Sequence, residues 1–305
     1  NLRTSDLTWE TTTQTNIGLD LTVLSGRLTF NADYYYKKTK NMLMNVSLPA
    51  GAAAATSIAR NEGEMVNKGF EFSISSKNFR GGAFTWDTDF NISFNRNKLT
   101  KLELQKVYYD AKTADVVNDY VVRNEPGGFY GYISDGVDPE TGELMYRDLN
   151  HDGKISSSDR TYIGDPNPDF TYGMTNTFSW KGFNLSIFIQ GSYGNDVYNA
   201  SRIETEGMYD GKNQSTRVLG RWRIPGQITD VPKANFKLLN STYFVEDGSY
   251  LRLKDVSLSY NVKGKLLKKW GITRLQPYFT ATNLLTWTSY SGMDPEVNQW
   301  GNSGT

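Results

Sequence analysis

The feature that most constrains this chain is a strict alternation of apolar and polar residues. It recurs in six segments, near residues 16–23, 28–37, 70–75, 84–95, 172–180 and 183–190. A period of two residues predicts β-strands, because successive side chains of a strand point to opposite faces. One parity is apolar or aromatic throughout, interrupted only by Thr88 and Asn176: Ile17, Leu19, Leu21, Val23, Leu28, Phe30, Ala32, Tyr34, Tyr36, Phe70, Phe72, Ile74, Phe84, Trp86, Phe90, Ile92, Phe94, Tyr172, Met174, Phe178, Trp180, Phe183, Leu185, Ile187 and Ile189.

The other parity of the same segments is strongly polar. Among its positions only Tyr35 and Phe188 are apolar, and the rest include Asn16, Asp20, Asn31, Asp33, Lys37, Glu71, Asp87, Asp89, Asn91, Asn95, Asn184 and Gln190. A strand with one dry and one wet face fits the wall of a membrane β-barrel, which meets lipid outside and water inside. A soluble β-sandwich alternates in the same way, so alternation alone leaves both architectures open.

The lengths of the connections favour the membrane barrel. Residues 24–27, 78–83 and 181–182 read as tight turns, whereas the connections near 44–65, 99–168 and 195–246 are long. Outer-membrane barrels alternate short periplasmic turns with long extracellular loops in this manner. We therefore predict an all-β chain that forms part of a transmembrane antiparallel β-barrel, with long extracellular loops and short periplasmic turns.

Aromatic residues and two less regular segments extend this prediction. Phe84, Trp86, Phe178, Trp180 and Phe183 lie beside the short turns, and Tyr34 to Tyr36 lie at the opposite end of a strand, as expected for two interfacial belts. Segments 248–262 and 275–287 are predicted as two further strands, the first with a bulge near Lys254 because its apolar parity changes there. A one-turn helical cap is predicted over 263–270.

Composition excludes several other classes. No run of about 18 apolar residues exists, so a membrane-spanning helix is not expected. The 33 basic and 33 acidic residues cancel, which leaves no electrostatic signature of nucleic-acid binding. The chain has no Cys and a single His, His151, so we predict that it is not an enzyme. Asp87 and Asp89 share the wet face of one strand, where lining a lumen explains them better than glycosidase catalysis.

One loop has the spacing of a calcium site. In the spacing of an EF-hand-like loop, oxygen-bearing side chains occupy positions 1, 3, 5 and 12: Asp148, Asn150, Asp152 and Asp159. Position 6 is Gly153, which allows the tight turn, and position 7 is Lys154, which would offer its backbone carbonyl. We predict one structural Ca²⁺ held by loop 148–159. Position 12 is Asp rather than the usual Glu, and a turn closed by its own hydrogen bonds is the alternative.

The long connections also carry many aromatic residues. Flat rings beside amides and charges can bind the apolar faces of sugars, and loop packing is the competing role. Candidate substrate-binding residues are Phe129, Tyr130, Tyr209 and Trp222, within a larger set that also includes Tyr132, Tyr193, Trp287 and Trp300.

Several ordered motifs resemble the SusC/RagA family of TonB-dependent outer-membrane transporters. The resemblance lies in Leu7 to Asp20 (LTWETTTQTNIGLD), Asn67 to Phe72 (NKGFEF), Arg160 to Phe170 (RTYIGDPNPDF), Tyr250 to Tyr260 (YLRLKDVSLSY) and Thr282 to Glu296 (TNLLTWTSYSGMDPE). It covers nearly the whole chain, 1–305. It implies that the chain is the C-terminal part of a 22-stranded barrel, contributing about eight strands, with the plug domain and the final strand lying outside it.

The resemblance also implies a function. Such a protein would import oligosaccharides across the outer membrane with a SusD-like surface lipoprotein, and the TonB complex would supply energy through the missing plug. Importing peptides rather than glycans is one alternative. A passive porin or surface adhesin is another, and a soluble carbohydrate-binding β-protein is a third.

Overall fold

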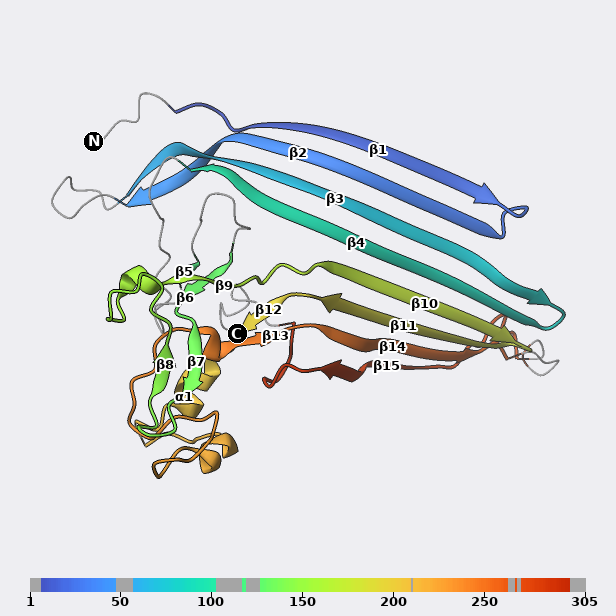
Figure 1. Cartoon of the computed structure of the whole chain (residues 1–305). Coiled ribbons are helices and arrows are strands. Elements are labelled where there is room, and N and C mark those ends of the chain that lie inside the picture. Colours follow the sequence, from blue (N-terminus) through green and yellow to red (C-terminus); the bar gives the residue numbers. More distant parts are fainter. Residues whose placement is uncertain are drawn as a thin grey trace.

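The main body of the protein is one eight-stranded antiparallel sheet (Figure 1). A computed structural model describes residues 7–47, 57–102, 117–118, 127–209, 211–262, 267 and 270–296. The sheet has the order β1-β2-β3-β4-β10-β11-β14-β15. Its strands are β1 (Thr11–Val23), β2 (Leu28–Ser47), β3 (Ser57–Gly81), β4 (Phe84–Leu102), β10 (Phe170–Trp180), β11 (Phe183–Tyr193), β14 (Tyr250–Tyr260) and β15 (Tyr278–Thr288). Each strand pairs with the next sheet strand along the chain, as predicted, and the sheet is open at β1 and β15.

The remaining elements are short and lie in the two long connections. Between β4 and β10 are β5 (Val117–Asn118), β6 (Phe129–Gly131), β7 (Ser134–Val137), β8 (Leu144–Tyr146), the 3-10 helix η1 (Ser157–Asp159) and β9 (Thr161–Gly164). Between β11 and β14 are β12 (Asp196–Tyr198), α1 (Ser201–Glu206), η2 (Thr216–Gly220), η3 (Thr242–Phe244) and β13 (Val245–Asp247). Both connections leave the same end of the sheet (Figure 1). The helices of the described residues are too short and too polar to cross a membrane.

Tight turns join the strands at the opposite end. Lys181 and Gly182 form a two-residue turn with φ of 47° and 98°, the type I′ geometry that matches the twist of a hairpin. Leu24, Ser25 and Gly26 also have positive φ between β1 and β2. The predicted turns at 24–27 and 181–182 are confirmed. The turn predicted at 78–83 is shorter, because β3 runs to Gly81 and β4 begins at Phe84.

Strand β1 begins at Thr11 rather than near residue 16, and three other strands extend still farther beyond their predicted ends. The alternating pattern indicated 28–37, 70–75 and 84–95, but β2, β3 and β4 run to Ser47, from Ser57 and to Leu102. The predicted long connection at 44–65 is therefore wrong, because the two strands pair with each other from Leu28 and Ser76 out to Ser47 and Ser57. Just beyond the apolar band, Lys37 and Lys38 lie on opposite faces of β2, so the alternation disappears there although the strand continues.

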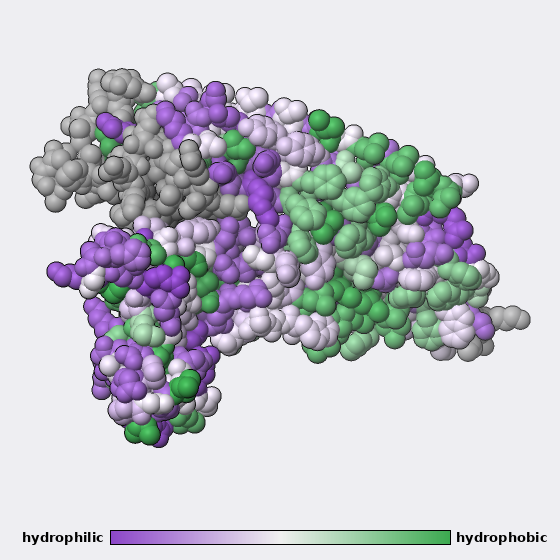
Figure 2. Space-filling view, viewed as in Figure 1, coloured by the Kyte–Doolittle hydropathy of each residue, from purple (hydrophilic) through white to green (hydrophobic). Residues whose placement is uncertain are grey.

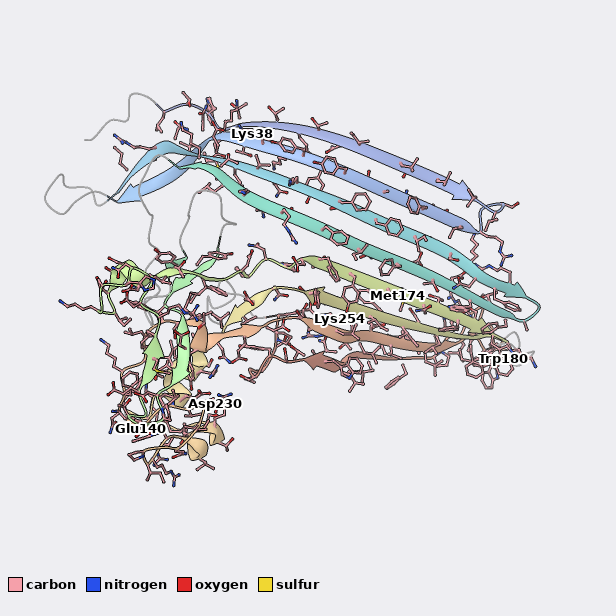
Figure 3. All side chains as sticks on the ribbon, viewed as in Figure 1. Lys38, Glu140, Met174, Trp180, Asp230 and Lys254 are labelled. Atoms are coloured by element: carbon pink, nitrogen blue, oxygen red, sulfur yellow. The ribbon has the colours of Figure 1, made fainter. Side chains whose placement is uncertain are left out.

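The predicted apolar parity forms one continuous surface. Figure 2 shows hydrophobic residues gathered in a band across the sheet, with hydrophilic residues towards the long connections. Ile17 is 66% exposed and Leu19 56%, so nothing in the described chain covers this face. In Figure 3, Met174 lies midway along β10 and Trp180 at its short-turn end.

Aromatic rings gather at both edges of this band. At the short-turn edge Phe178 stacks on Trp86 at 5.8 Å between centroids, and Phe183 lies 4.4 Å from Tyr260. At the long-connection edge Phe170 lies 5.6 Å from Phe94 and 5.2 Å from Tyr193. The two edges thus have the side chains that favour a membrane–water interface.

The two polar exceptions on the apolar face bind each other. Asn176 and Thr88 are directly opposite across β10 and β4, and the Thr88 hydroxyl donates to Asn176 Oδ1 at 2.7 Å. The indole N–H of Trp86 donates to the same oxygen at 3.0 Å, and the Asn78 amide donates to Thr88 Oγ1 at 2.6 Å. A polar group facing hydrocarbon is costly unless it finds such partners.

The opposite face is linked by polar contacts between strands. Tyr35 donates to Asn95 at 2.8 Å, and Ser75 donates to Asp89 at 2.6 Å. Asp87 pairs with Arg80. Asp87 and Asp89 therefore serve as acceptors in the wall of the wet face.

The last two strands also follow the prediction. β14 changes register against both neighbours at Lys254, between Phe188 and Ile189 of β11 and between Leu253 and Asp255 of its own chain, so the predicted bulge is confirmed. In the predicted cap at 263–270, Leu267 is helical, and residues 263–266, 268 and 269 lie outside the described residues. Trp300 lies outside them as well.

Candidate functional site

The two long connections fold together at one end of the sheet. We call the described residues of 127–169 and 194–249 the loop body. Tyr132 exchanges backbone hydrogen bonds with the second connection, donating to Asn240 at 2.9 Å and accepting from Thr242 at 3.0 Å. Strands β12 and β13 pair over Asp196–Tyr198 and Val245–Asp247. Segments more than 100 residues apart are thereby held in one unit.

The loop body has its own apolar core. Its buried residues come from both connections: Tyr132, Leu144, Val197, Val218, Val231 and Phe244. Phe244 is 1% exposed and lies between the rings of Tyr198 and Tyr243, at 5.8 and 5.1 Å between centroids. Of the described buried apolar residues, all except Leu99 of β4 lie here, whereas the large apolar residues of the band on the sheet face outwards.

A buried ionic cluster supports this core. Arg202 is 8% exposed and donates to Glu206 at 2.9 Å and to Glu246 at 3.1 Å. Tyr243 donates to Glu206 at 2.8 Å, and Arg217 lies 3.2 Å from the same carboxylate. Burial, together with the Glu206 charge, raises the pKa of Tyr243 above its ordinary value. This cluster was not predicted from the sequence, although the four-residue spacing of Arg202 and Glu206 is a signal of a helical ion pair.

Loop 148–159 is organised around Asp159. This side chain is fully buried, and its Oδ1 accepts from the backbone N–H of Leu149 at 2.9 Å. Its Oδ2 accepts from the N–H of Ser156 at 2.7 Å. These backbone hydrogen bonds, the one from Ser156 first, hold the pKa of Asp159 below its ordinary value, although burial opposes them. Asp159 thus closes the loop as a carboxylate.

The other predicted calcium ligands also bind backbone N–H groups. Asp148 accepts from Gly153 at 2.7 Å, Asn150 from Asp152 at 3.1 Å, and Asp152 from Lys154 at 2.8 Å. In the part of the chain that the structure describes, no three His, Cys, Asp or Glu side chains are arranged to hold a metal ion.

One atom of this loop nevertheless fits a cation. Asp148 Oδ1 is buried and has no hydrogen-bond partner among the described residues. A buried carboxylate oxygen without a donor is unfavourable, and a cation is the partner that it accepts best. His151, which has a φ of 59°, lies at the turn of the same loop.

The four aromatic candidates for substrate binding lie in different surroundings. Phe129 and Tyr130 are adjacent in β6, and the Phe129 ring packs 5.8 Å from Tyr198. Trp222 donates its indole N–H to the carbonyl of Pro139 at 2.8 Å, and its ring covers Gly142. Trp222 is therefore engaged in holding the two connections together.

Tyr209 is the most open of the four. It is 50% exposed, and its hydroxyl donates to the carbonyl of Ile203 at 3.2 Å. Its ring lies over Gly207, where a side chain would collide with it. The ring is thus fixed in place while half of the side chain remains accessible.

A cavity of about 480 Å³ and a second of about 660 Å³ lie at this end of the molecule. The second belongs to the loop body and is lined by Asp138, Thr141, Glu143, Leu144, Met145, Tyr146, Ile155, Phe236, Lys237 and Leu239. Burial raises the pKa of Tyr146 to about 12, and its hydroxyl accepts from the N–H of Leu239 at 2.8 Å. This cavity therefore has a neutral phenol at its wall across the physiological pH range.

The tip of the loop body exposes apolar side chains. Leu219, Ile224 and Ile228 are 69%, 65% and 93% exposed. Figure 3 places Asp230 and Glu140 in this projecting region, away from the sheet. A patch of exposed apolar side chains rimmed by polar residues is a feature of surfaces that contact another protein.

Beyond β15 the chain returns towards the wet face of the sheet. Arg252 is 4% exposed and donates to Glu296 at 2.6 Å and to Asp294 at 2.7 Å. Glu296 also accepts from Gln190 at 2.9 Å and from Tyr250 at 2.7 Å. These contacts fix the residues after Thr288 against β11 and β14.

Comparison with known proteins gives one consistent family. Residues 1–284 match the family described as TonB dependent receptor-like, beta-barrel. The chain is 36% identical over 315 residues to TonB-dependent receptor P3 of Formosa agariphila, covering 96% of this chain and 31% of the relative. It is 31% identical over 313 residues to TonB-dependent receptor SusC of Bacteroides thetaiotaomicron, covering 96% and 30%. The chain thus spans about a third of the length of the curated relatives that it matches.

A solved structure has the same fold. The structure of the RagAB peptide transporter aligns with a TM-score of 0.83 and 29% sequence identity, over 95% of this chain and 33% of that chain. The open sheet described above therefore corresponds to one sector of a larger β-barrel wall.

Proposed function

Because this chain belongs to the TonB-dependent receptor-like β-barrel family of the outer membrane, we propose that it forms part of the wall of an importer of oligosaccharides. The observation that carries the proposal is the combination of an uncovered apolar band on the sheet with a folded loop body at one end. In this arrangement the band meets lipid, the wet face lines the path, and the loop body meets cargo outside. The work of the chain is then binding and passage rather than covalent chemistry.

The preference for glycans rests on the aromatic surface of the loop body. The half-exposed ring of Tyr209 offers a fixed flat face of the kind that sugars stack on. Phe129, Tyr130 and Trp222 would shape the surface around the cargo. A peptide is the second candidate, because the solved structure with the same fold is described as a peptide transporter.

Calorimetry with the full-length receptor separates these two cargo classes. We expect heat of binding from a pool of oligosaccharides and none from a pool of peptides. Tyr209→Ala should weaken oligosaccharide binding, whereas Tyr278→Ala should not, because Tyr278 is even more exposed, at 77%, but begins β15 at the short-turn end. Binding of peptides alone would replace the glycan proposal, and equal effects of the two variants would remove Tyr209 from the site.

Uptake also needs energy and a partner. We infer that the TonB complex drives transport by acting on a part of the receptor other than the described sheet. Uptake that continues in cells without TonB would instead indicate a passive porin. A surface adhesin would bind cargo without importing it.

The proposed partner is a SusD-like lipoprotein that contacts the apolar tip of the loop body. A photoreactive residue in place of Ile228 should crosslink to the purified lipoprotein, and one in place of Ile17 should not, although both positions are highly exposed. Ile17 lies on the apolar band and would be covered by lipid or detergent. Crosslinking from Ile17 alone would contradict the proposal.

We further propose that loop 148–159 takes one Ca²⁺ with a structural role. Asp148, Asn150, Asp152, Asp159 and the backbone carbonyl of Lys154 would hold it. The support is their spacing and the buried Asp148 Oδ1 without a hydrogen-bond partner. Binding would require Asp159 to leave part of its present hydrogen bonding.

The calcium proposal is tested by proteolysis of the full-length receptor. Removing calcium with a chelator should increase cleavage within 145–165. The Asp152→Ala variant should show the same increase in cleavage even when calcium is present. Asp138→Ala is the control, because Asp138 caps a separate turn through Glu140 and Thr141. If chelation does not change the cleavage, the calcium proposal is wrong and hydrogen bonds alone close the loop.

A further inference from the structure

A basic patch lies immediately outside the apolar band on β2, β3 and β4. The register of these strands places their side chains in cross-strand rows. One row contains Tyr34, Phe70 and Phe94, which are the last large apolar residues towards the long connections. The next row contains Tyr36, Lys68 and Arg96, and the row after it Lys38, Val66 and Lys98.

All three rows point to the same side of the sheet. Cross-strand partners share a face, and residues two apart along a strand share it too. The basic residues therefore continue the lipid-facing parity and are not part of the wet face. The change from aromatic to basic takes place within two residues, or about 7 Å of strand. Figure 3 shows Lys38 towards the long-connection end of β2.

Two of the four cations have no counter-ion among the residues that the structure describes. Lys38 pairs with Glu64 at 2.8 Å, and Arg96 pairs with Asp169 at the start of β10. Lys68 and Lys98 are exposed and form no ion pair with any residue that the structure describes. The patch thus keeps two uncompensated positive charges at the edge of the band.

The same residues line a concave surface. A cavity of about 480 Å³ is bounded by Tyr36, Val66, Lys68, Arg96, Lys98 and Thr100, with Asn97. Its wall combines an aromatic ring and a branched aliphatic side chain with three cations. A ligand that fits it has an apolar part beside the band and an anionic part farther out.

We propose that this patch binds the phosphorylated headgroup of a lipid in the outer leaflet. The acyl chains would lie against the aromatic row, and the phosphate would lie between Lys68, Arg96 and Lys98. Lysine and arginine next to a membrane attract anionic headgroups, and Arg pairs with phosphate in a bidentate manner. The place of the patch at the edge of the apolar band favours a lipid over a soluble anion.

The site is a property of the long strands alone. β1 carries Thr15 and Thr13 opposite Tyr36 and Lys38, and β10 begins at Phe170, at the level of the aromatic row. The patch is therefore three strands wide, which suits one or two headgroups rather than a continuous ring of lipid. The proposal is independent of which cargo the protein imports.

Native mass spectrometry of the full-length receptor in detergent tests this proposal. Lipid A, a phosphorylated glycolipid, is titrated against its dephosphorylated form, and inorganic phosphate is added as a competitor. We expect the phosphorylated form to bind and the dephosphorylated form not to bind. Removing one cation should lower the affinity for the phosphorylated lipid about fivefold, so the double variant Lys68→Gln/Lys98→Gln should lower it roughly 25-fold.

The matched control is Lys37→Gln/Lys77→Gln. These lysines lie on β2 and β3 but on the opposite parity, so the variant removes the same charge from the wet face. Lipid binding that falls equally in both double variants would reduce the effect to net charge and overturn the proposal. Displacement by inorganic phosphate at concentrations similar to the lipid would make the patch a site for free anions and would overturn it as well.

Discussion

The first four strands of the sheet and the last four differ in how far they extend beyond the apolar band. β1 to β4 contain 13, 20, 25 and 19 residues, whereas β10, β11, β14 and β15 contain 11 each. An 11-residue strand is about what a tilted membrane crossing requires. The last four strands therefore end at the edge of the apolar band, and β2 to β4 continue well beyond it.

The structure that lies beyond the apolar band therefore differs between the two halves of the sheet. On β2 to β4 it is the sheet itself, held by the same ladder of backbone hydrogen bonds as the membrane part. On the other half it is the loop body, which has a separate core around Phe244. We conclude that the loop body can loosen or change shape while the sheet stays intact. The outer parts of the long strands cannot loosen without disturbing the sheet, because they belong to the same hydrogen-bonded ladder.

The largest effect that tests this comparison concerns the core of the loop body. Phe244→Ala should destabilise the loop body by about 3–5 kcal/mol, because a large ring leaves a closely packed site. Hydrogen exchange should increase across 127–169 and 194–249 and stay unchanged in the sheet. Ile228→Ala, at a residue 93% exposed, is the control and should change neither. If the sheet loosens together with the loop body, the two are one cooperative unit.

A smaller effect tests the two faces of β11. Ile187→Arg places a charge on the apolar face near mid-strand and should cost about 2–4 kcal/mol of barrel stability. Ser186→Arg, on the adjacent position and the opposite face, should be far milder. The measurement is the fraction of full-length receptor that remains heat-modifiable after folding into lipid. Similar losses for both variants would show that the faces are assigned wrongly.

A still smaller loss of stability is expected from changing Asn176 and Thr88, the polar pair on the apolar face. Asn176→Leu should cost about 1–3 kcal/mol, because it leaves the Thr88 hydroxyl and the Trp86 indole without their acceptor. Adding Thr88→Val should recover part of that loss, because it removes the unpaired hydroxyl of Thr88, while the Asn78 amide loses its acceptor in this variant. Unfolding of the four receptors in urea completes the double-mutant cycle, and additive losses would mean that the pair makes no net contribution.

The smallest expected effect is a local dependence on pH. The lowered pKa of Asp159 means that its carboxylate stabilises the folded loop above its ordinary pKa of 3.8. That contribution is lost as the pH falls through the lower pKa of the folded state, so loop 148–159 should open only below about pH 3.8. Hydrogen exchange of Leu149 and Ser156 reports this opening. Opening near neutral pH would point to another group.

Much of the sheet could be predicted because lipid and water impose opposite demands on adjacent residues. Where both faces carry polar side chains, as at Lys37 and Lys38, the pattern no longer marks a strand, and the predicted strands were therefore too short. The bulge at Lys254 was visible because it shifts the apolar parity by one position.

The loop body could not be predicted in this way. Its strands of two to four residues, such as β12 and β13, pair across nearly 50 residues of intervening chain. Nothing local in the sequence specifies such pairing. Trp222 illustrates the difficulty, because a tryptophan in a polar loop suggests an exposed ring, and only the fold brings Gly142 and Pro139 beneath it.

If alternate residues of the sheet face lipid and water, a cysteine scan of β11 should show a reactivity pattern with a period of two residues. The chain has no Cys, so single substitutions from Phe183 to Gln190 give unique thiols in this segment. In the full-length receptor in lipid, a water-soluble thiol reagent should modify positions 184, 186, 188 and 190. A reagent confined to the bilayer should modify 183, 185, 187 and 189. Reactivity without a period of two residues would contradict the account.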